Sequence, residues 1–543
     1  MKTTITNQHH DVVIIGAGVG GLYMLHTCRK LGLDAIVLER GSGVGGTWYW
    51  NRYPGARCDV ESLDYSYSFD DALQREWRWT EKYPTQPEIL AYLEHVADRF
   101  DLKRDIHFNV NVQHANFEDA ANTWKIRAKD GSVYSATYLI AATGALSEAK
   151  DSHFAGQDDF AGAILRSSNW PQDGFDFSGK RAAVIGTGST GIQIAPMIAK
   201  DASKLFVFQR TPSYSIPAFN RFLTKQEVDE AIATYPERRK VARASVLGVD
   251  TQNPNISTWD VSEADRQKAY HANYDYGGPM KLVTTFNDPI FDKKANDVLA
   301  AFLAERIRER VGNPEWADRV LIPNYPVASR RLCVDTDYFE TLTRDNVELI
   351  DTRSDPIQRF TPTGIQTKNA QYEVDVIVLA TGFDALTGAL RALDPHGRGG
   401  VSLRRKWDEY PASYLGVMVS GFPNFFTITG PLSPSVNSNM FVAIEQHVEF
   451  IAKLLARAHS QGNAVVEPTA EAEKQWIDHA AQIASQTVFP LTDSWYTGAN
   501  IPGKASAVMP YLGGIGGFQA QLDAIEADGF RGFKFTALEP ATA

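Results

Sequence analysis

A glycine-rich segment near the N-terminus constrains the fold of this 543-residue chain strongly, because it recurs later in the same context. The segment Gly16-Ala17-Gly18-Val19-Gly20-Gly21 follows the apolar run Asp11–Ile15 and precedes an apolar-periodic stretch over about 20–31. A strand, a glycine turn and a helix in this order begin a βαβ unit that binds a dinucleotide, with the pyrophosphate at the helix N-terminus. The glycines expected to form the turn are Gly16, Gly18 and Gly21.

The second copy, Gly186-Thr187-Gly188-Ser189-Thr190-Gly191, lies between the predicted strands Arg181–Ile185 and Lys204–Gln209. The two copies differ at the end of the following strand. In the first unit the strand Ala35–Glu39 ends in an acid, and we expect Glu39 to accept hydrogen bonds from ribose hydroxyls. In the second unit Arg210 takes this place, and its guanidinium can bind a 2′-phosphate that a carboxylate would repel.

The second unit therefore predicts NADPH as its cofactor. A nicotinamide reacts poorly with oxygen whereas a reduced flavin reacts readily, so two dinucleotide sites in one chain indicate a flavin in one and its reductant in the other. We accordingly expect FAD and NADPH. The fold class is α/β, with two Rossmann-like domains, because alternating strands and helices build parallel sheets.

The length and the pattern between the motifs predict more than one core, since single cores stop growing at roughly 250 to 300 residues. Charged, helix-favouring sequence between about Ile216 and Pro323 indicates a helical insertion. The apolar run Val374–Leu379 is expected to return to the second sheet as a strand.

Composition excludes several classes of protein. The formal net charge of -11 provides no positive field for nucleic acid, and no apolar run approaches the roughly 20 residues of a membrane helix. We expect a cytoplasmic protein that binds neither. Three cysteines, with no C-x-x-C pair, predict no metal site and argue against a flavin disulfide reductase.

A longer pattern resembles a known family. The segment from Gly45 to Asp59 reads GGTWYWNRYPGARCD and is similar to the GxWxxxxYPGxxxD signature of Baeyer-Villiger monooxygenases. Four further stretches resemble the phenylacetone and cyclohexanone monooxygenase branch of that family: LIAATG at 139–144, VLATGFDALTG at 378–388, IEQHVEF at 444–450 and SWYTGANIPGK at 494–504. The resemblance implies conversion of ketones to esters or lactones with NADPH and O2, through a C4a-peroxyflavin.

The resemblance also implies a division of the chain. The FAD-binding domain would comprise residues 1–148 and 384–543, the NADPH-binding domain residues 149–215 and 330–383, and the helical insertion residues 216–329. The resemblance further implies a small-molecule ketone as substrate. We expect a monomer or a weak oligomer.

Site residues follow from the same resemblance. Arg331 matches the family's catalytic arginine and Asp59 the acid that holds it, a pairing that would orient the guanidinium. Arg330 would assist Arg210 at the 2′-phosphate, and Trp495 would contact the nicotinamide side. Further expected cofactor contacts are Gly46, Thr47 and Trp48 for FAD, and Thr187, Gly188, Ser189, Thr190, Gln193 and Thr211 for NADPH. Leu432 and Met440 are the first and last residues of a segment that resembles a substrate-pocket loop.

One departure from the family pattern bears on activity. The family's FxGxxxHxxxWP motif corresponds here to residues 160–171, and Arg166 replaces its histidine. Arginine is longer and always charged, so a role that needs neutral imidazole would be lost. The preceding linker Ser147–Phe154 also lacks the prolines usual in relatives. Three alternatives stay open: a related enzyme that oxygenates sulfur or nitrogen, a weakly coupled NADPH oxidase, and a flavin-binding sensor without turnover.

Overall fold

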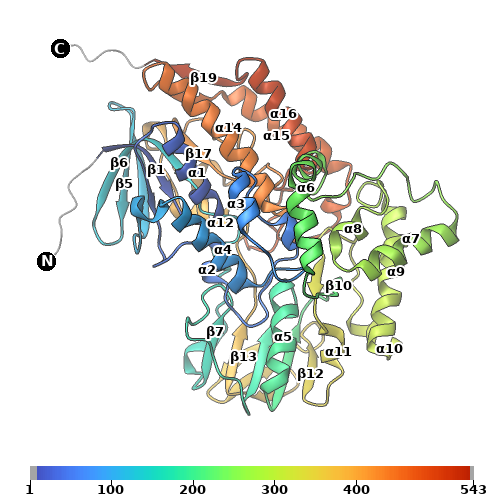
Figure 1. Cartoon of the computed structure of the whole chain (residues 1–543). Coiled ribbons are helices and arrows are strands. Elements are labelled where there is room, and N and C mark those ends of the chain that lie inside the picture. Colours follow the sequence, from blue (N-terminus) through green and yellow to red (C-terminus); the bar gives the residue numbers. More distant parts are fainter. Residues whose placement is uncertain (1–8, 538–543) are drawn as a thin grey trace.

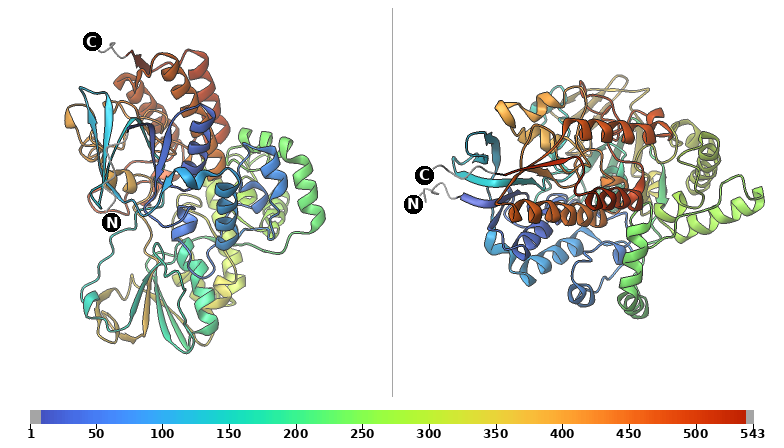
Figure 2. Two further views of the ribbon diagram at one scale, coloured as in Figure 1. Left: turned by 60° about the vertical axis from the view of Figure 1, so that its left-hand side comes forward. Right: turned by 90° about the horizontal axis from the view of Figure 1, so that it is seen from above.

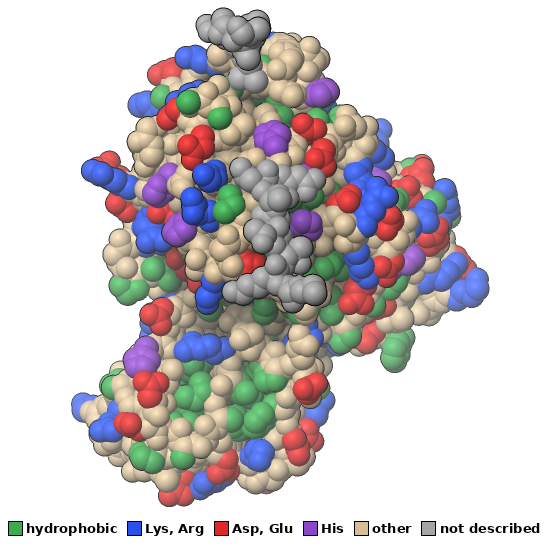
Figure 3. All heavy atoms as spheres, turned by 90° about the vertical axis from the view of Figure 1, so that its left-hand side faces the viewer, with side chains coloured by type: hydrophobic (Ala, Val, Ile, Leu, Met, Phe, Trp, Pro, Cys, Tyr) green, Lys and Arg blue, Asp and Glu red, His purple; other side chains and the backbone are tan. Residues whose placement is uncertain are grey.

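A computed structural model describes residues 9–537 of the chain. The described chain forms two lobes and a helical part beside them (Figures 1 and 2). The N-terminal strands and the C-terminal helices share the upper lobe of Figure 1, while the second glycine motif lies in the lower lobe. Figure 3 shows a narrow waist between the lobes on one face. The α/β class with two Rossmann-type sheets is confirmed; one sheet is entirely parallel, and the other also contains antiparallel strands.

The first sheet has the strand order β3-β2-β1-β6-β5-β4. Its strands are β1 His9–Ile15, β2 Ala35–Leu38, β3 Ile106–His107, β4 Val112–Glu118, β5 Thr123–Ala128 and β6 Val133–Ala141. The predicted strand Asp11–Ile15 starts earlier than expected, because His9 and His10 continue the parallel pairing with β6. A late strand, β17 Phe425–Thr427, also pairs in parallel with β6. The C-terminal part of the chain thus completes the first sheet.

The second sheet is entirely parallel, in the order β12-β9-β8-β16-β7. Its strands are β7 Ala163–Arg166, β8 Arg181–Ile185, β9 Lys204–Gln209, β12 Val347–Asp351 and β16 Val376–Leu379. β8 and β9 have the predicted bounds. β16 begins two residues later than predicted, because the Val374 N–H donates to Thr363 in the loop of a small antiparallel sheet. That sheet consists of β13 Ile357–Thr361, β14 Gly364–Thr367 and β15 Gln371–Glu373.

In each sheet the predicted helix begins within its glycine motif: α1 Val19–Lys30 in the first and α5 Ser189–Asp201 in the second. The predicted helical insertion contains α6 Lys225–Ala244, α7 Glu263–Tyr276, α8 Pro279–Val283, α9 Lys293–Val311 and α10 Pro314–Val320. A capping box between Thr224 and Glu227 fixes the start of α6. The two parallel strands β10 Ser215–Pro217 and β11 Cys333–Asp335 pair at its base. The predicted domain boundaries themselves stay predictions.

The C-terminal helices cover the first sheet. α14 Met440–Ser460 packs against α1, and α16 Gly514–Ala527 packs against α6, which ties the helical part to the upper lobe (Figure 1). The remaining helices and strands are α2 Thr47–Trp50, α3 Asp71–Glu76, α4 Gln86–Arg99, α11 Tyr338–Leu342, α12 Gly388–Leu393, α13 Leu403–Lys406, α15 Ala470–Ser485, β18 Val465–Pro468 and β19 Phe533–Thr536. Within residues 9–537, no helix combines the length and apolar character needed to cross a membrane.

The last glycine of each motif is required for packing. A Cβ at Gly21 would lie 1.8 Å from the Gly16 carbonyl oxygen, and one at Gly191 would lie 1.9 Å from the Gly186 oxygen. Both contacts involve backbone, which cannot rotate away. These glycines therefore let α1 and α5 approach the strands that precede them.

We predict that Gly191→Ala lowers the melting temperature of the protein, since forcing a methyl group into a packed contact costs about 1–3 kcal/mol. Gly517→Ala is the matched control, because a Cβ there meets nothing within 4 Å. This exposed helical position should tolerate alanine or gain slightly from it. Equal melting temperatures for the two variants, measured by circular dichroism, would contradict the packing role of Gly191.

Candidate active site

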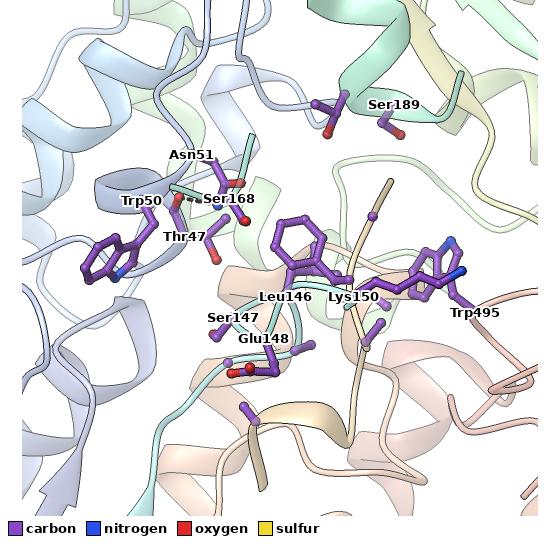
Figure 4. Close-up of a pocket in the computed structure, with 18 of the residues that line it drawn as sticks. Thr47, Trp50, Asn51, Leu146, Ser147, Glu148, Lys150, Ser168, Ser189 and Trp495 are labelled. Carbon is purple, nitrogen blue, oxygen red and sulfur yellow. Dashed lines mark hydrogen bonds between the residues drawn. The ribbon is translucent and has the colours of Figure 1, made fainter. Parts of the chain in front are cut away.

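Both glycine motifs open into one cavity of about 1420 Å³ between the lobes. The carboxyl ends of parallel strands from the two sheets meet there, which is where open α/β sheets bind ligands. In Figure 4, Thr47, Trp50 and Asn51 lie on one side of this cavity, and Leu146, Lys150 and Trp495 lie on another. One continuous space thus connects the two predicted cofactor sites.

The first motif leaves a helix N-terminus free for a ligand. Gly18 is the N-cap of α1 and supplies no side-chain cap, so the first-turn N–H groups have no side-chain acceptor. A Cβ at Gly46 would lie 2.8 Å from the Gly18 Cα, so the two glycine backbones meet at the cavity wall. These features fit a pyrophosphate, which needs close backbone approach and the positive helix end.

Glu39 lies beside this turn and also lines the cavity. Its carboxylate accepts hydrogen bonds from the backbone N–H groups of Ala17, at 2.7 Å, and Gly41, at 2.6 Å. These bonds fix the direction of the carboxylate, whose remaining lone pairs can accept from a ribose. The residues present therefore fit the adenosine side of FAD.

The YPG part of the signature connects the two lobes. The Tyr53 hydroxyl donates to the Gln193 side-chain oxygen at 2.9 Å, and the Gln193 amide donates to the Arg57 carbonyl at 3.1 Å. A Cβ at Gly55 would lie 2.7 Å from the Gln193 carbonyl oxygen, and Gly55 has a φ of +81°. Gln193 lines the cavity, but its polar atoms contact the first lobe. The structure thus gives this residue an interdomain role that the sequence did not predict.

The second motif provides a similar free helix end. Gly188 is the N-cap of α5 without a side-chain cap, and a Cβ there would meet nothing within 4 Å, so the space beside it is open. Thr187 and Thr211 are joined by a hydrogen bond of 3.1 Å from the Thr187 hydroxyl to the Thr211 carbonyl. Ser189 and Thr190 in the first turn of α5 line the same cavity.

Arg210 and Arg330 add positive charge next to this helix end. In the described part of the chain neither forms an ion pair with a carboxylate. Arg330 stacks over the Tyr325 ring at 4.9 Å, donates to the Asp493 carbonyl at 2.6 Å, and has a buried Nε with no partner among the described residues. Burial and the neighbouring Arg210 lower the pKa of Arg330. Cations that repel each other and lack counter-ions fit the 2′-phosphate of NADPH.

The strongest polar contact in the cavity is between Arg331 and Asp59. Arg331 Nε donates to Asp59 Oδ2 at 2.8 Å and Nη2 donates to Oδ1 at 2.6 Å, a bidentate geometry. The third nitrogen, Nη1, donates to the Val436 carbonyl. Each side chain of the pair is only 21% exposed.

The surroundings keep Arg331 charged. Burial alone would lower the pKa of Arg331, but Asp59 and the phenol of Tyr496 more than offset this and raise it. Burial in turn raises the pKa of Tyr496, although the guanidinium opposes that shift. Tyr496 was not predicted from the sequence; its signal is its position beside Trp495 in the SWYTGANIPGK stretch. The Trp495 ring lies 4.0 Å from the Tyr496 ring and lines the cavity.

Not all predicted site residues reach the cavity. Trp48 and Met440 line it, whereas Leu432 is fully buried in the core of the first lobe, where its N–H donates to the Met509 carbonyl. We therefore keep only Met440 as a substrate candidate. Arg166 ends β7 at the edge of the second sheet and is not part of the cavity lining, although Ser168 is.

Comparisons with known proteins agree with this geometry. Residues 13–271 match the family model of pyridine nucleotide-disulphide oxidoreductases. A Baeyer-Villiger monooxygenase of Pseudooceanicola batsensis is 40% identical, with 97% of each chain covered. The chain belongs to the Baeyer-Villiger monooxygenase family. Its predicted enzyme class, an FAD- and NADPH-dependent monooxygenase, is thereby confirmed.

Two further relatives show the range of this family. The solved structure of an oxidized steroid monooxygenase bound to NADP has a TM-score of 0.93 and 46% identity, covering 98% of this chain and 100% of that one. A phenazine N-monooxygenase of Lysobacter antibioticus is 38% identical, again with 97% of each chain covered. Overall similarity therefore does not separate ketone oxidation from oxidation at nitrogen.

We predict that Asp59→Asn destabilises the protein by about 2 kcal/mol, because a partly buried guanidinium loses its counter-charge. The measurement is the shift in melting temperature of the flavin-loaded protein. Asp159→Asn makes the same change of charge at an exposed, 3.8 Å contact with Arg359 and should have no effect. An Asp59→Asn protein as stable as the control would show that the pair contributes little to the fold.

Proposed function

We propose that this family member inserts an oxygen atom next to a ketone carbonyl and so forms an ester or a lactone, using FAD, NADPH and O2. The observation that carries the proposal is the bidentate pair of Arg331 and Asp59. The pair lines the same cavity as both glycine motifs. A permanent, oriented cation therefore lies where the reactive ends of two dinucleotides can meet.

The proposed cofactor sites follow from the fit of the residues. FAD would bind at the first sheet, against Gly16, Gly18, Glu39 and the segment from Gly46 to Trp48. NADPH would bind at the second sheet, against the turn from Thr187 to Thr190 and the cations Arg210 and Arg330, with Trp495 toward the nicotinamide. The FAD-binding domain would then comprise residues 1–148 and 384–543, separated by the NADPH-binding domain and its helical insertion.

In this assignment FAD supplies hydride acceptance from NADPH and the activation of O2. The protein supplies a positive charge for the negative oxygen that develops during insertion. Arg331 can do this without reorganising, because Asp59 and the Val436 carbonyl hold three of its nitrogens. Since the guanidinium keeps its proton, it acts as an electrostatic stabiliser and not as an acid.

The proposal for the substrate names a chemical class, and the proposal for the oligomeric state gives a range. We propose a small-molecule ketone as the substrate of this internal cavity, and a monomer or a weak oligomer as the active form. Met440, at the start of α14, faces this cavity and would contact the substrate. The cytoplasmic location stays a prediction.

A second candidate function is oxidation at nitrogen. The phenazine N-monooxygenase comparison favours it, since that enzyme is as similar to this chain as several ketone monooxygenases are. The two reactions make different demands on the site. Attack on a ketone uses a nucleophilic, anionic oxygen, which a fixed guanidinium stabilises, whereas attack by nitrogen needs an electrophilic, protonated one. The Arg331–Asp59 pair therefore favours the ketone reaction.

We predict that Arg331→Ala still permits flavin reduction by NADPH but lowers ester formation by at least about 100-fold, as loss of an oxyanion-stabilising donor does. Reduction is followed by anaerobic stopped-flow absorbance and ester formation by gas chromatography. Arg359→Ala, which removes a half-exposed arginine of the second lobe, is the control. Normal ester yield from Arg331→Ala would remove this residue from the mechanism.

A further inference from the structure

Lys150 is a cation of the interdomain linker whose position is fixed by its backbone. Its N–H donates to the Gly382 carbonyl at 3.0 Å, and Ala149 forms a β-bridge with Phe383. Gly382 lies in the segment after β16, at the carboxyl edge of the second sheet. The Ala380 carbonyl oxygen lies at this edge, 2.3 Å from the position that a Cβ on Gly186 would occupy. The linker thus holds Lys150 over the second glycine motif.

The side chain of Lys150 lines the cavity, as Figure 4 shows. Within the described residues its ammonium group forms no ion pair, not even with Glu148 or Asp151 of the same linker. Lys504, by contrast, forms an ion pair with Asp384. A cavity-facing ammonium without a counter-ion is costly unless a ligand supplies the negative charge.

The charges around Lys150 indicate which ligand group that is. Burial lowers the pKa of Lys150, and the positive charge of Arg210 lowers it further. Arg210 acts in the same way on Arg330. Arg210 is therefore the common neighbour of two other cations, and all three lack carboxylate partners among the described residues. A doubly charged phosphate placed beside Arg210 would relieve both repulsions.

We propose that Lys150 is a third cation of the 2′-phosphate site, together with Arg210 and Arg330. The inference deepens the proposed function, on which it rests, and makes Lys150 a determinant of NADPH over NADH. It also gives the linker a direct part in cofactor binding, because the residue that contacts the phosphate lies in the segment that joins the two lobes. Lys150 is the one of these three cations that lies in the linker, so it would couple the linker to occupancy of the NADPH site.

The test is the affinity of the FAD-loaded protein for NADP+ and NAD+, measured by calorimetric titration of Lys150→Gln, Lys150→Arg and Lys368→Gln. Lys368 is an exposed lysine of the same lobe, so its variant makes the same change of charge away from the cavity. We expect Lys150→Gln to bind NADP+ about tenfold more weakly, the loss of roughly one charge-assisted contact, and NAD+ within about twofold of wild type. Lys150→Arg should restore most of the affinity, and Lys368→Gln should match wild type.

Adenosine 2′,5′-bisphosphate and AMP separate the phosphate from the nicotinamide. Lys150→Gln should weaken binding of the bisphosphate and leave binding of AMP unchanged. Equal losses for NADP+ and NAD+, or no loss for either, would overturn the inference. An Arg210→Gln variant distinguishes this failure from failure of the proposed function. If Arg210→Gln removes the preference for NADP+ while Lys150→Gln keeps it, the phosphate site stands without Lys150. If the wild-type protein has no preference for NADP+ over NAD+, the inference and the proposed NADPH site both fail.

Discussion

The ion pair between Arg331 and Asp59 joins residues that are 272 positions apart in the sequence. Asp59 comes from the segment that follows the first glycine motif, and Arg331 comes from the approach to β11 at the base of the helical part. Burial of a guanidinium and a carboxylate is favourable only with near-ideal geometry and further hydrogen bonds. The bidentate contact and the Val436 carbonyl meet this requirement. This one interaction therefore joins the two lobes and places a positive charge in the cavity.

Other contacts across the waist reinforce this arrangement. Tyr53 and the Arg57 carbonyl bind both polar groups of Gln193, and Gly55 allows the first lobe to touch the α5 backbone. On another side, the linker is hydrogen-bonded to the segment after β16, and the Asn500 side chain donates to the Phe383 carbonyl. The YPG signature and the SWYTGANIPGK stretch are thus explained by packing between the lobes as well as by contact with cofactors.

Much of this fold could be predicted because local patterns determine it. The second motif required a strand, a turn and a helix in a fixed order, and β8 and β9 have the bounds that their apolar runs predicted. The roles of Arg331 and Asp59 needed the family resemblance, since nothing local in the sequence pairs residues so far apart. Leu432 was placed at the substrate because its segment resembles a pocket loop; its side chain instead points into the core.

The residues that the sequence did not reveal share a physical cause. Lys150 lies in a loop with no periodicity, and backbone contacts of the linker with the segment after β16 bring it over the second motif. Tyr496 affects Arg331 through a tertiary contact. Gln193 was assigned to NADPH because it lies on the helix of the second glycine motif, whereas its side chain contacts the first lobe. Each depends on contacts between segments that are far apart in the sequence. Predicting them needs the relative positions of segments that are far apart in the sequence.

The central claim is that the protein inserts an oxygen atom next to a ketone carbonyl. The most direct measurement is mass spectrometry of products formed with labelled O2 and NADPH from a panel of ketones, including phenylacetone and cyclohexanone, with a sulfide and an aromatic amine in parallel. Hydrogen peroxide is quantified in the same reactions. The account predicts an ester or lactone that carries one labelled oxygen atom. Label found only in sulfoxide or N-oxide, or NADPH consumption matched entirely by peroxide, would contradict it.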